Sequence, residues 1–173
     1  SVWDLDVLDW LDPYLTFYKI GSGDLTAYPL LDGLARRGKP ILLSTGLASL
    51  AEVVDAVRFI RSVNPAYDDP CRLALLQCTS MYPTATEEVN LRVMDTLRDA
   101  TGLAVGYSHH AIDTLALLVA AARGASVLEF HFTDQREGRT FRDHAISLTA
   151  ACKKPEAIAQ GPAALGLAAQ LHQ

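Results

Sequence analysis

The chain has 173 residues, of which 50% are hydrophobic and 20% are charged, with 15 basic residues against 20 acidic ones. This composition supplies enough apolar material for one well-buried domain and excludes a disordered chain. The formal net charge is −5 and the basic residues are scattered along the chain, so we expect no nucleic-acid partner.

No apolar run approaches the roughly 18 residues that a membrane-spanning helix needs, so no membrane partner is expected. Residues 1–6 are acidic, where a secretory signal would be basic. The cysteines Cys71, Cys78 and Cys152 are odd in number and fit no zinc or CxxC spacing, which favours reduced thiols. We therefore expect a cytoplasmic protein with Cys78 packed in its core.

Strand and helix patterns alternate along the chain, after a first helix over residues 4–11 that looks already under way. Five short runs are nearly continuous in apolar residues, as is typical of strands covered by helices. A capping box, Ser49 with Glu52, marks the start of one helix. The predicted strands are 17–21, 40–44, 73–77, 103–107 and 127–131; the predicted helices are 30–36, 50–63, 91–100, 112–123 and an interrupted one at 157–173.

This alternation predicts parallel strands joined by right-handed crossovers, either in a doubly wound sheet or in a (β/α)8 TIM barrel. Polar residues that recur just past most strand ends favour the barrel, because an open sheet gathers such groups mainly at one switch point. A barrel needs eight strands and only five are visible. We therefore interpret residues 1–173 as a partial TIM-barrel domain, its last five β/α units, cut from a longer chain and with two open sheet edges.

Two histidines follow consecutive predicted strands. His110 ends the segment 105–110 and His131 ends the segment 127–131, with the helical pattern 112–123 between them. Each alone is typical of a hydrogen-bonded core histidine, whereas the pair at equivalent strand ends indicates two nitrogen ligands for one metal ion. Two imidazoles leave coordination positions open, which suits a divalent ion that polarises a substrate carbonyl.

Lys19 ends the first strand, and Ser22 follows between two glycines. Glycines let the backbone approach a phosphate closely, and the ammonium and hydroxyl supply charge and a directed donor. The alternative is an ordinary glycine-rich turn beside a solvated lysine. Ser44 and Ser108, after the second and fourth strands, are either helix-capping residues or further contacts to one phosphate or carboxylate.

Tyr82, just past the third strand, either lines a sugar-sized pocket or packs with an exposed hydroxyl. The segment 136–144 is a polar loop after the last strand. We interpret Arg136 and Glu137 as solvated, whereas Asp143 and His144 can fold over the mouth of the barrel and contact a substrate.

Six ordered motifs together resemble the sialic acid synthase family, whose members condense phosphoenolpyruvate with N-acetylmannosamine or a related amino sugar. The resemblance covers about residues 1–150. The motifs are Lys19-Ile-Gly-Ser-Gly-Asp24, Leu43-Ser-Thr-Gly46, Cys78-Thr-Ser-Met-Tyr-Pro-Thr84, Val89-Asn-Leu91, Gly106-Tyr-Ser-His-His110 and His131-Phe-Thr133.

The resemblance implies a (β/α)8 catalytic domain, usually followed by an antifreeze-like domain that completes the partner subunit's site in a homodimer. It implies a divalent metal ion, by family habit Mn²⁺ or Mg²⁺, and small-molecule substrates. In the implied reaction, the metal polarises the aldehyde of the open-chain sugar, and phosphoenolpyruvate attacks that aldehyde. Water then adds and phosphate leaves. By position the implied roles are metal binding for His110 and His131, phosphoenolpyruvate binding for Lys19, Ser22, Ser44, Ser80 and Ser108, sugar binding for Tyr82 and Asp143, and catalysis for Asp24 and Lys19.

The chain departs from the family at His109, where aspartate is usual, and at Phe130, where a basic residue is usual; the loop 133–143 also lacks the usual Pro-Gly-Pro. Two alternatives stay open. One is a related synthase acting on a sugar phosphate, for which Arg139 and Arg142 are the candidate phosphate ligands. The other is a non-catalytic fragment that only binds ligand.

Overall fold

The computed structural model describes residues 4–149, and its five strands form one sheet in chain order. All neighbouring strands are parallel, and all five predicted strands are confirmed, with β4 extending to His109. The strands are β1 (Tyr18–Ile20), β2 (Ile41–Ser44), β3 (Leu73–Gln77), β4 (Ala104–His109) and β5 (Leu128–Phe130). The predicted helix at 157–173, and Cys152, lie outside the described residues.

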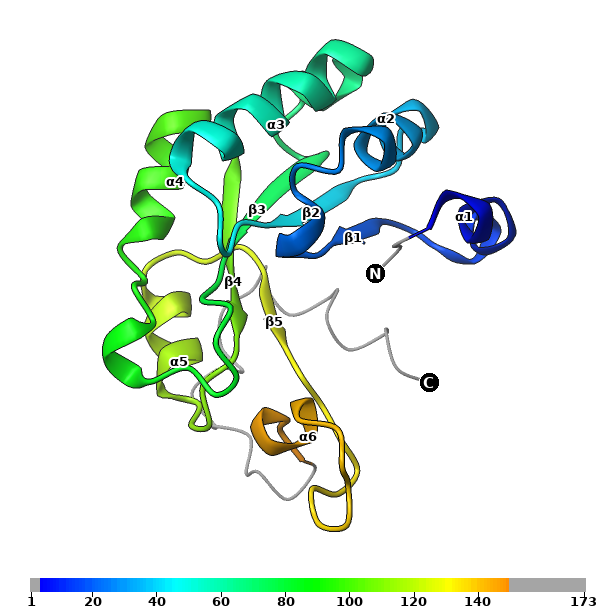
Figure 1. The fold of residues 1–173 in the computed structure, drawn as a ribbon. Coiled ribbons are helices and arrows are strands. Elements are labelled where there is room, and N and C mark those ends of the chain that lie inside the picture. Colours follow the sequence, from blue (N-terminus) through cyan, green and yellow to red (C-terminus); the bar gives the residue numbers. More distant parts are fainter. Residues whose placement is uncertain (1–3, 150–173) are drawn as a thin grey trace.

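Helices α1 to α5 follow one another in an arc around the outer side of the sheet (Figure 1). The α-helices are α1 (Leu5–Leu11), α2 (Tyr28–Arg37), α3 (Leu50–Val63), α4 (Val93–Thr101), α5 (Leu115–Ala122) and the short α6 (Asp143–Ile146). Single 3-10 turns are η1 (Asp12–Tyr14), η2 (Ser22–Asp24), η3 (Pro65–Asp68) and η4 (Thr86–Glu88).

The predicted helices are confirmed with shifted ends, except that α1 is not already under way at residue 4. Asp4 is its N-cap, with extended backbone and a carboxylate that accepts from the Asp6 amide, so α1 begins at Leu5. The predicted capping box of α3 is present: Ser49 Oγ accepts from the Glu52 amide at 3.3 Å, and Glu52 Oε2 accepts from the Ser49 amide at 2.7 Å.

The parallel register assigns each strand residue to one of two faces, because successive side chains alternate. Tyr18, Ile41 and Leu73 share the outer face, where they are fully buried beneath the helices. Lys19 pairs with Leu42, so the inner face carries the first of the predicted site residues. The apolar core therefore lies between sheet and helices, and the chemistry is confined to the inner face.

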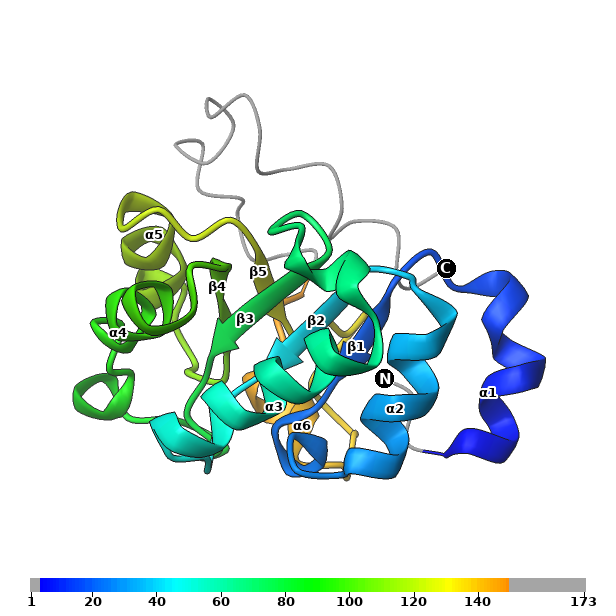
Figure 2. The ribbon, with the colours of Figure 1, turned by 90° about the horizontal axis from the view of Figure 1, so that it is seen from above.

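The sheet is strongly curled, as the contact between its two outermost strands shows. Lys19 Nζ on β1 lies 3.6 Å from Glu129 Oε1 on β5. In a flat sheet these strands would be four spacings of about 4.8 Å apart, roughly 19 Å, which is further than the two side chains reach together. The unbroken strand order and the helices on one side exclude the doubly wound alternative. The predicted partial (β/α)8 barrel, seen from above in Figure 2, is confirmed.

The two ends of the described sheet are open: β1 pairs only with β2, and β5 only with β4. Within residues 4–149, no helix is both long enough and apolar enough to cross a membrane.

His109 lies on the outer face of β4 and is 1% exposed. Its ring packs edge-on against Tyr107, with ring centroids 5.7 Å apart, and neither ring nitrogen has a hydrogen-bond partner of normal geometry among residues 4–149. Burial lowers the pKa of His109, an effect that the backbone of Asp113 partly offsets. The side chain is therefore a neutral core imidazole.

We predict that Gly106→Ala lowers the free energy of unfolding by about 1–3 kcal/mol, the usual cost of overpacking. A Cβ at residue 106 would lie 2.3 Å from the Val127 carbonyl oxygen and 2.6 Å from Leu76 Cδ2. Gly23→Ala is the matched control, because nothing lies within 4 Å of its added Cβ. Urea denaturation measures both; equal stability of the two variants would contradict the packing described here.

We also predict that the protein loses stability as the pH falls below about 6.5, the ordinary histidine value. Because the folded-state pKa of His109 is lowered, His109 binds a proton in this pH range in the unfolded chain and not in the folded one. Protonation therefore favours unfolding. Thermal unfolding between pH 7 and pH 5 measures the effect, and His109→Phe should reduce the fall in midpoint. A variant with an unchanged pH dependence would show that His109 does not contribute.

Candidate functional site

A lysine and a serine from neighbouring strands are joined at the carboxyl ends of β1 and β2. Lys19 Nζ donates to Ser44 Oγ at 2.8 Å and to the Ile20 carbonyl at 2.9 Å. The Lys19 side chain is 14% exposed and Glu129 is its ion-pair partner. The ammonium is therefore held in one position at the inner face, as a fixed positive charge beside a hydroxyl.

Three loops meet beside this pair, around Gly46. Ser22 Oγ, in the turn after β1, accepts from the Gly46 amide at 3.0 Å and lies 3.0 Å from Cys78 Sγ. A Cβ at Gly46 would come within 2.5 Å of Ser80 Oγ, 2.8 Å of Cys78 Sγ and 2.9 Å of Ser22 Oγ. Only glycine fits here, and its lack of a side chain brings the predicted residues Ser22 and Ser80 together.

Ser108 and Asp24, two further predicted site residues, make fewer contacts than Lys19, Ser22 and Ser44. Ser108 is two residues after Gly106 on the inner face of β4 and is 4% exposed, and its hydroxyl has no hydrogen-bond partner within residues 4–149. Asp24 is half-buried at the end of η2. Its carboxylate makes no ion pair or side-chain hydrogen bond with another described residue. Both groups are therefore free to take a ligand.

The two predicted metal-binding histidines lie side by side, with ring centroids 5.5 Å apart. Tyr82 stacks on His110 with ring centroids 4.2 Å apart, and its hydroxyl lies 3.0 Å from His110 Nε2. His110 Nδ1 lies 2.7 Å from the Thr79 carbonyl oxygen. Because a carbonyl can only accept, Nδ1 carries the proton, and the Nε2 lone pair is left for the Tyr82 hydroxyl or for a metal.

The protonation states agree with this geometry. Burial lowers the pKa of His110, so the imidazole is neutral at physiological pH. Burial, and next the nearby Asp143 carboxylate, raise the pKa of Tyr82, so its phenol keeps its proton and donates to Nε2. A neutral imidazole whose proton is held by a backbone carbonyl is the usual form of a metal-binding histidine.

Asp143, the first residue of α6, folds over the mouth as expected. Its Oδ2 lies 3.8 Å from His131 Nδ1, and its Oδ1 is buried without a hydrogen-bond partner among the described residues. Arg142 lies beside it, with Nε 3.6 Å from Asp143 Oδ1 and the guanidinium 4.9 Å from the centroid of the Tyr82 ring. The orphaned carboxylate oxygen is an unmet acceptor next to the histidine pair.

These residues fit a metal ion that keeps open positions. Within residues 4–149, no three His, Cys, Asp or Glu side chains form a metal-binding group, so an ion held here would take only the two imidazoles from these residues. Metal–nitrogen bonds are about 2.1 Å long, and the neighbouring rings can both reach one ion. If an ion were bound, Asp143, whose Oδ2 lies 3.8 Å from His131 Nδ1, would orient the His131 ring.

Three features of the site were not predicted from sequence. Glu129 pairs with Lys19; its position two residues before His131 was the available signal, since both then share a face. Cys78 is buried as expected, but its sulfur contacts Ser22 at the mouth. The interpretation of Arg136 as solvated was wrong: its Nε donates to the Ser147 carbonyl at 2.7 Å and anchors the loop.

Comparison with known proteins assigns the chain to a family. The family model described as "NeuB family" matches residues 1–155. The chain is similar to the N,N'-diacetyllegionaminic acid synthase of Campylobacter jejuni, with 39% identity over 84% of this chain and 42% of that protein. It is 35% identical to the human N-acetylneuraminate-9-phosphate synthase, over 76% of this chain and 35% of that protein.

Among solved structures, the chain resembles an N-acetylneuraminic acid (sialic acid) synthetase from Leptospira borgpetersenii, solved with citrate. The TM-score is 0.76 with 31% identity, over 84% of this chain and 49% of that one. The chain thus spans less than half the length of these proteins. The family match extends over most of the sequence, and the chain belongs to the NeuB family.

Proposed function

We propose that the protein is a nonulosonic acid synthase, an enzyme that condenses phosphoenolpyruvate with an N-acetylmannosamine-type amino sugar and releases phosphate. The observation that carries the proposal is that a lysine with several hydroxyls and a pair of imidazoles lie at the same mouth of the barrel. The fixed Lys19 ammonium lies with a cluster of hydroxyls, and the His110 and His131 pair lies on the strands that complete the same curled sheet. Family membership supports the same reaction class.

In this proposal, phosphoenolpyruvate binds to Lys19, Ser22, Ser44, Ser80 and Ser108. Lys19 and Ser44 are already hydrogen-bonded to each other, so the site is preorganised and needs little rearrangement to accept an anion. Ser108 offers a hydroxyl unpaired within residues 4–149, whose partner would be the ligand. A single strong cation with several directed hydroxyls suits the phosphate and carboxylate of this substrate.

His110 and His131 would hold a divalent ion, Mn²⁺ or Mg²⁺, which would supply Lewis-acid polarisation of the sugar aldehyde. The enol-ether carbon of phosphoenolpyruvate attacks that aldehyde, water adds at the neighbouring carbon, and phosphate leaves. Tyr82 and Asp143 orient the sugar beside the histidines. Lys19 neutralises the phosphate, and the unpaired Asp24 carboxylate moves a proton or positions the water.

A sugar phosphate is the second candidate substrate, and one observation favours it. Arg139 is taken up by a bidentate pair with Asp134, at 2.9 and 3.0 Å. Arg142, by contrast, has terminal nitrogens without a partner among residues 4–149 and lies over Tyr82 at the mouth. Of the two candidate arginines, Arg142 is therefore the one placed to bind a second phosphate.

We predict that the natural full-length protein releases phosphate from phosphoenolpyruvate when N-acetylmannosamine or its 6-phosphate and Mn²⁺ are present. Substitution His131→Ala should abolish this turnover and weaken Mn²⁺ binding by more than the roughly 10–100-fold that loss of an outer-shell partner costs. Phosphate release and calorimetric Mn²⁺ titration measure the two effects.

The matched control is His144→Ala, because His144 Nδ1 lies 2.9 Å from Thr133 Oγ1 and is not one of the proposed ligands. It should leave Mn²⁺ affinity unchanged. No phosphate release with any hexosamine and divalent ion would contradict the proposed reaction, and phosphoenolpyruvate binding without turnover would favour the ligand-binding alternative. Full Mn²⁺ affinity in His131→Ala would remove the metal role.

A further inference from the structure

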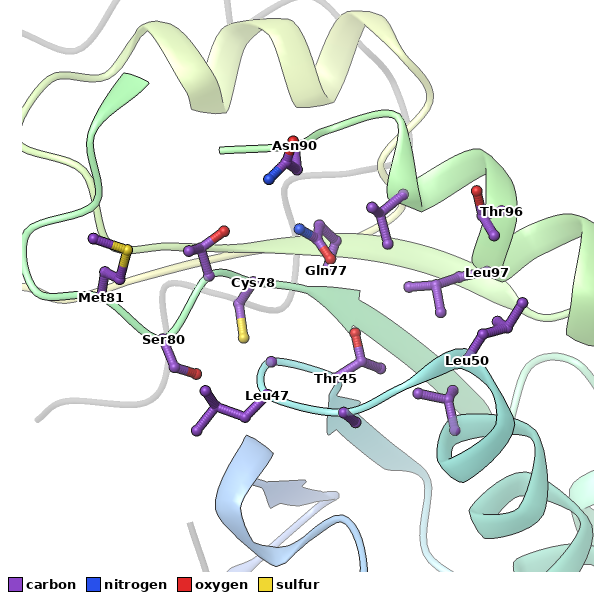
Figure 3. Close-up of a pocket in the computed structure, with 15 residues that line it drawn as sticks. Thr45, Leu47, Leu50, Gln77, Cys78, Ser80, Met81, Asn90, Thr96 and Leu97 are labelled. Atoms are coloured by element: carbon purple, nitrogen blue, oxygen red, sulfur yellow. The ribbon is translucent and has the colours of Figure 1, made fainter. Parts of the chain in front are cut away.

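A cavity of about 520 Å³ lies beside the mouth, between the loops after β2 and β3 and the helices α3 and α4 (Figure 3). Its volume is in the range of small-molecule sites. Lys19, His110 and His131 do not line it, whereas Gly46, Cys78 and Ser80 do, so it adjoins the hydroxyl cluster of the site described above.

The lining of the cavity selects for an uncharged ligand. No acidic or basic side chain lines it, so a bound ion would lose its hydration without gaining a partner. Val53, Val93 and Leu97 provide apolar walls. Phosphoenolpyruvate, sugar phosphates and metal ions are therefore poor occupants of this space.

One amide oxygen at the cavity accepts no hydrogen bond from residues 4–149. Gln77 lines it and is only 5% exposed. Its Nε2 makes a long hydrogen bond of 3.4 Å to the Val89 carbonyl, and its Oε1 accepts no hydrogen bond within residues 4–149. Gln77 Oε1 is therefore available as an acceptor for a ligand's N–H or O–H.

The rim of the cavity is apolar and unusually exposed. Leu47 is 88% exposed with a φ of 65°, a conformation that leucine rarely adopts, and Leu50 and Met81 are 43% and 48% exposed. Apolar side chains around an opening can cover the apolar part of a ligand that enters it. The rim and the walls therefore both favour a ligand with an apolar part.

Two residues that line the cavity also contact the Ser22 hydroxyl. Gly46 and Cys78 both line the cavity, and both contact Ser22 Oγ at 3.0 Å from the other side. A ligand that displaces the Cys78 side chain or the Gly46 backbone must therefore move the Ser22 hydroxyl.

The geometry points to a second ligand site in this cavity, for a small uncharged molecule with an apolar body and one hydrogen-bond donor, whose binding weakens phosphoenolpyruvate binding through Ser22. The coupling rests on the proposed function of Ser22, whereas the cavity site itself does not.

The test uses benzamide as the probe, because it is neutral and pairs an apolar ring with N–H donors. Cysteine labelling by N-ethylmaleimide, followed by mass spectrometry of each peptide, reports on the cavity through Cys78 and on bulk reagent through the exposed Cys71. Benzamide at about ten times its Kd should slow labelling of Cys78 by about tenfold and leave Cys71 unchanged. Methyl benzoate, which lacks the donor, and benzoate, which is charged, should protect far less.

Thr96→Trp should fill the cavity from α4 and abolish the protection, since Thr96 is exposed and lines the opening. Asp99→Trp, also exposed on α4 but outside the cavity, is the matched control and should preserve it. Equal protection of both cysteines, or of both tryptophan variants, would overturn the site.

Calorimetry of phosphoenolpyruvate binding with and without benzamide tests the coupling. A severalfold weaker phosphoenolpyruvate affinity with benzamide is expected in the parent protein and not in Thr96→Trp. Unchanged affinity would refute the coupling. A protein that binds no phosphoenolpyruvate at all, yet shows Cys78 protection, would refute the proposed function of Ser22 and leave the cavity site standing.

Discussion

The rest of the structure depends on the curl of the sheet, which the contact between Lys19 and Glu129 demonstrates. These residues lie on the first and last described strands, and their 3.6 Å separation is possible only if the strands bend toward each other. Curling turns one face of the sheet into a small enclosed surface. Side chains from loops distant in sequence then share a single mouth, where a flat sheet would spread them over several strand widths.

The alternation of side chains gives the two faces of the sheet different roles. The outer face is apolar and binds the helices, so the strands are held rigidly while the inner face is free to carry polar groups. His109 and His110 show the difference most clearly, since these adjacent imidazoles serve opposite faces. His109 is packed against Tyr107, and His110 is hydrogen-bonded to Thr79 and Tyr82 at the mouth. Rigid strands with polar ends are the usual way to preorganise a site.

Sequence patterns predicted the strands well because apolar runs of about five residues between turn residues are too short for buried helices and fit buried strands. The residues at the mouth followed from the strand ends, and Lys19, Ser44, His110 and His131 lie where that reasoning placed them. Reasoning from the strand ends could not predict contacts that depend on the curvature of the sheet. Glu129 stands 110 residues after Lys19, and only the curl of the sheet brings the two together. Arg136 was misjudged because a charged loop residue gives no local sign of the backbone carbonyl that it will meet.

Zero-length carbodiimide coupling measures the curl most directly, because it joins an amine and a carboxylate only where they touch. We predict a linked peptide between Lys19 and Glu129 that is absent in Glu129→Gln. The pair of Lys39 and Asp12, 2.9 Å apart, is the internal positive control. If Lys39 couples to Asp12 while Lys19 never couples to Glu129, the strands do not approach each other and the shared mouth does not exist.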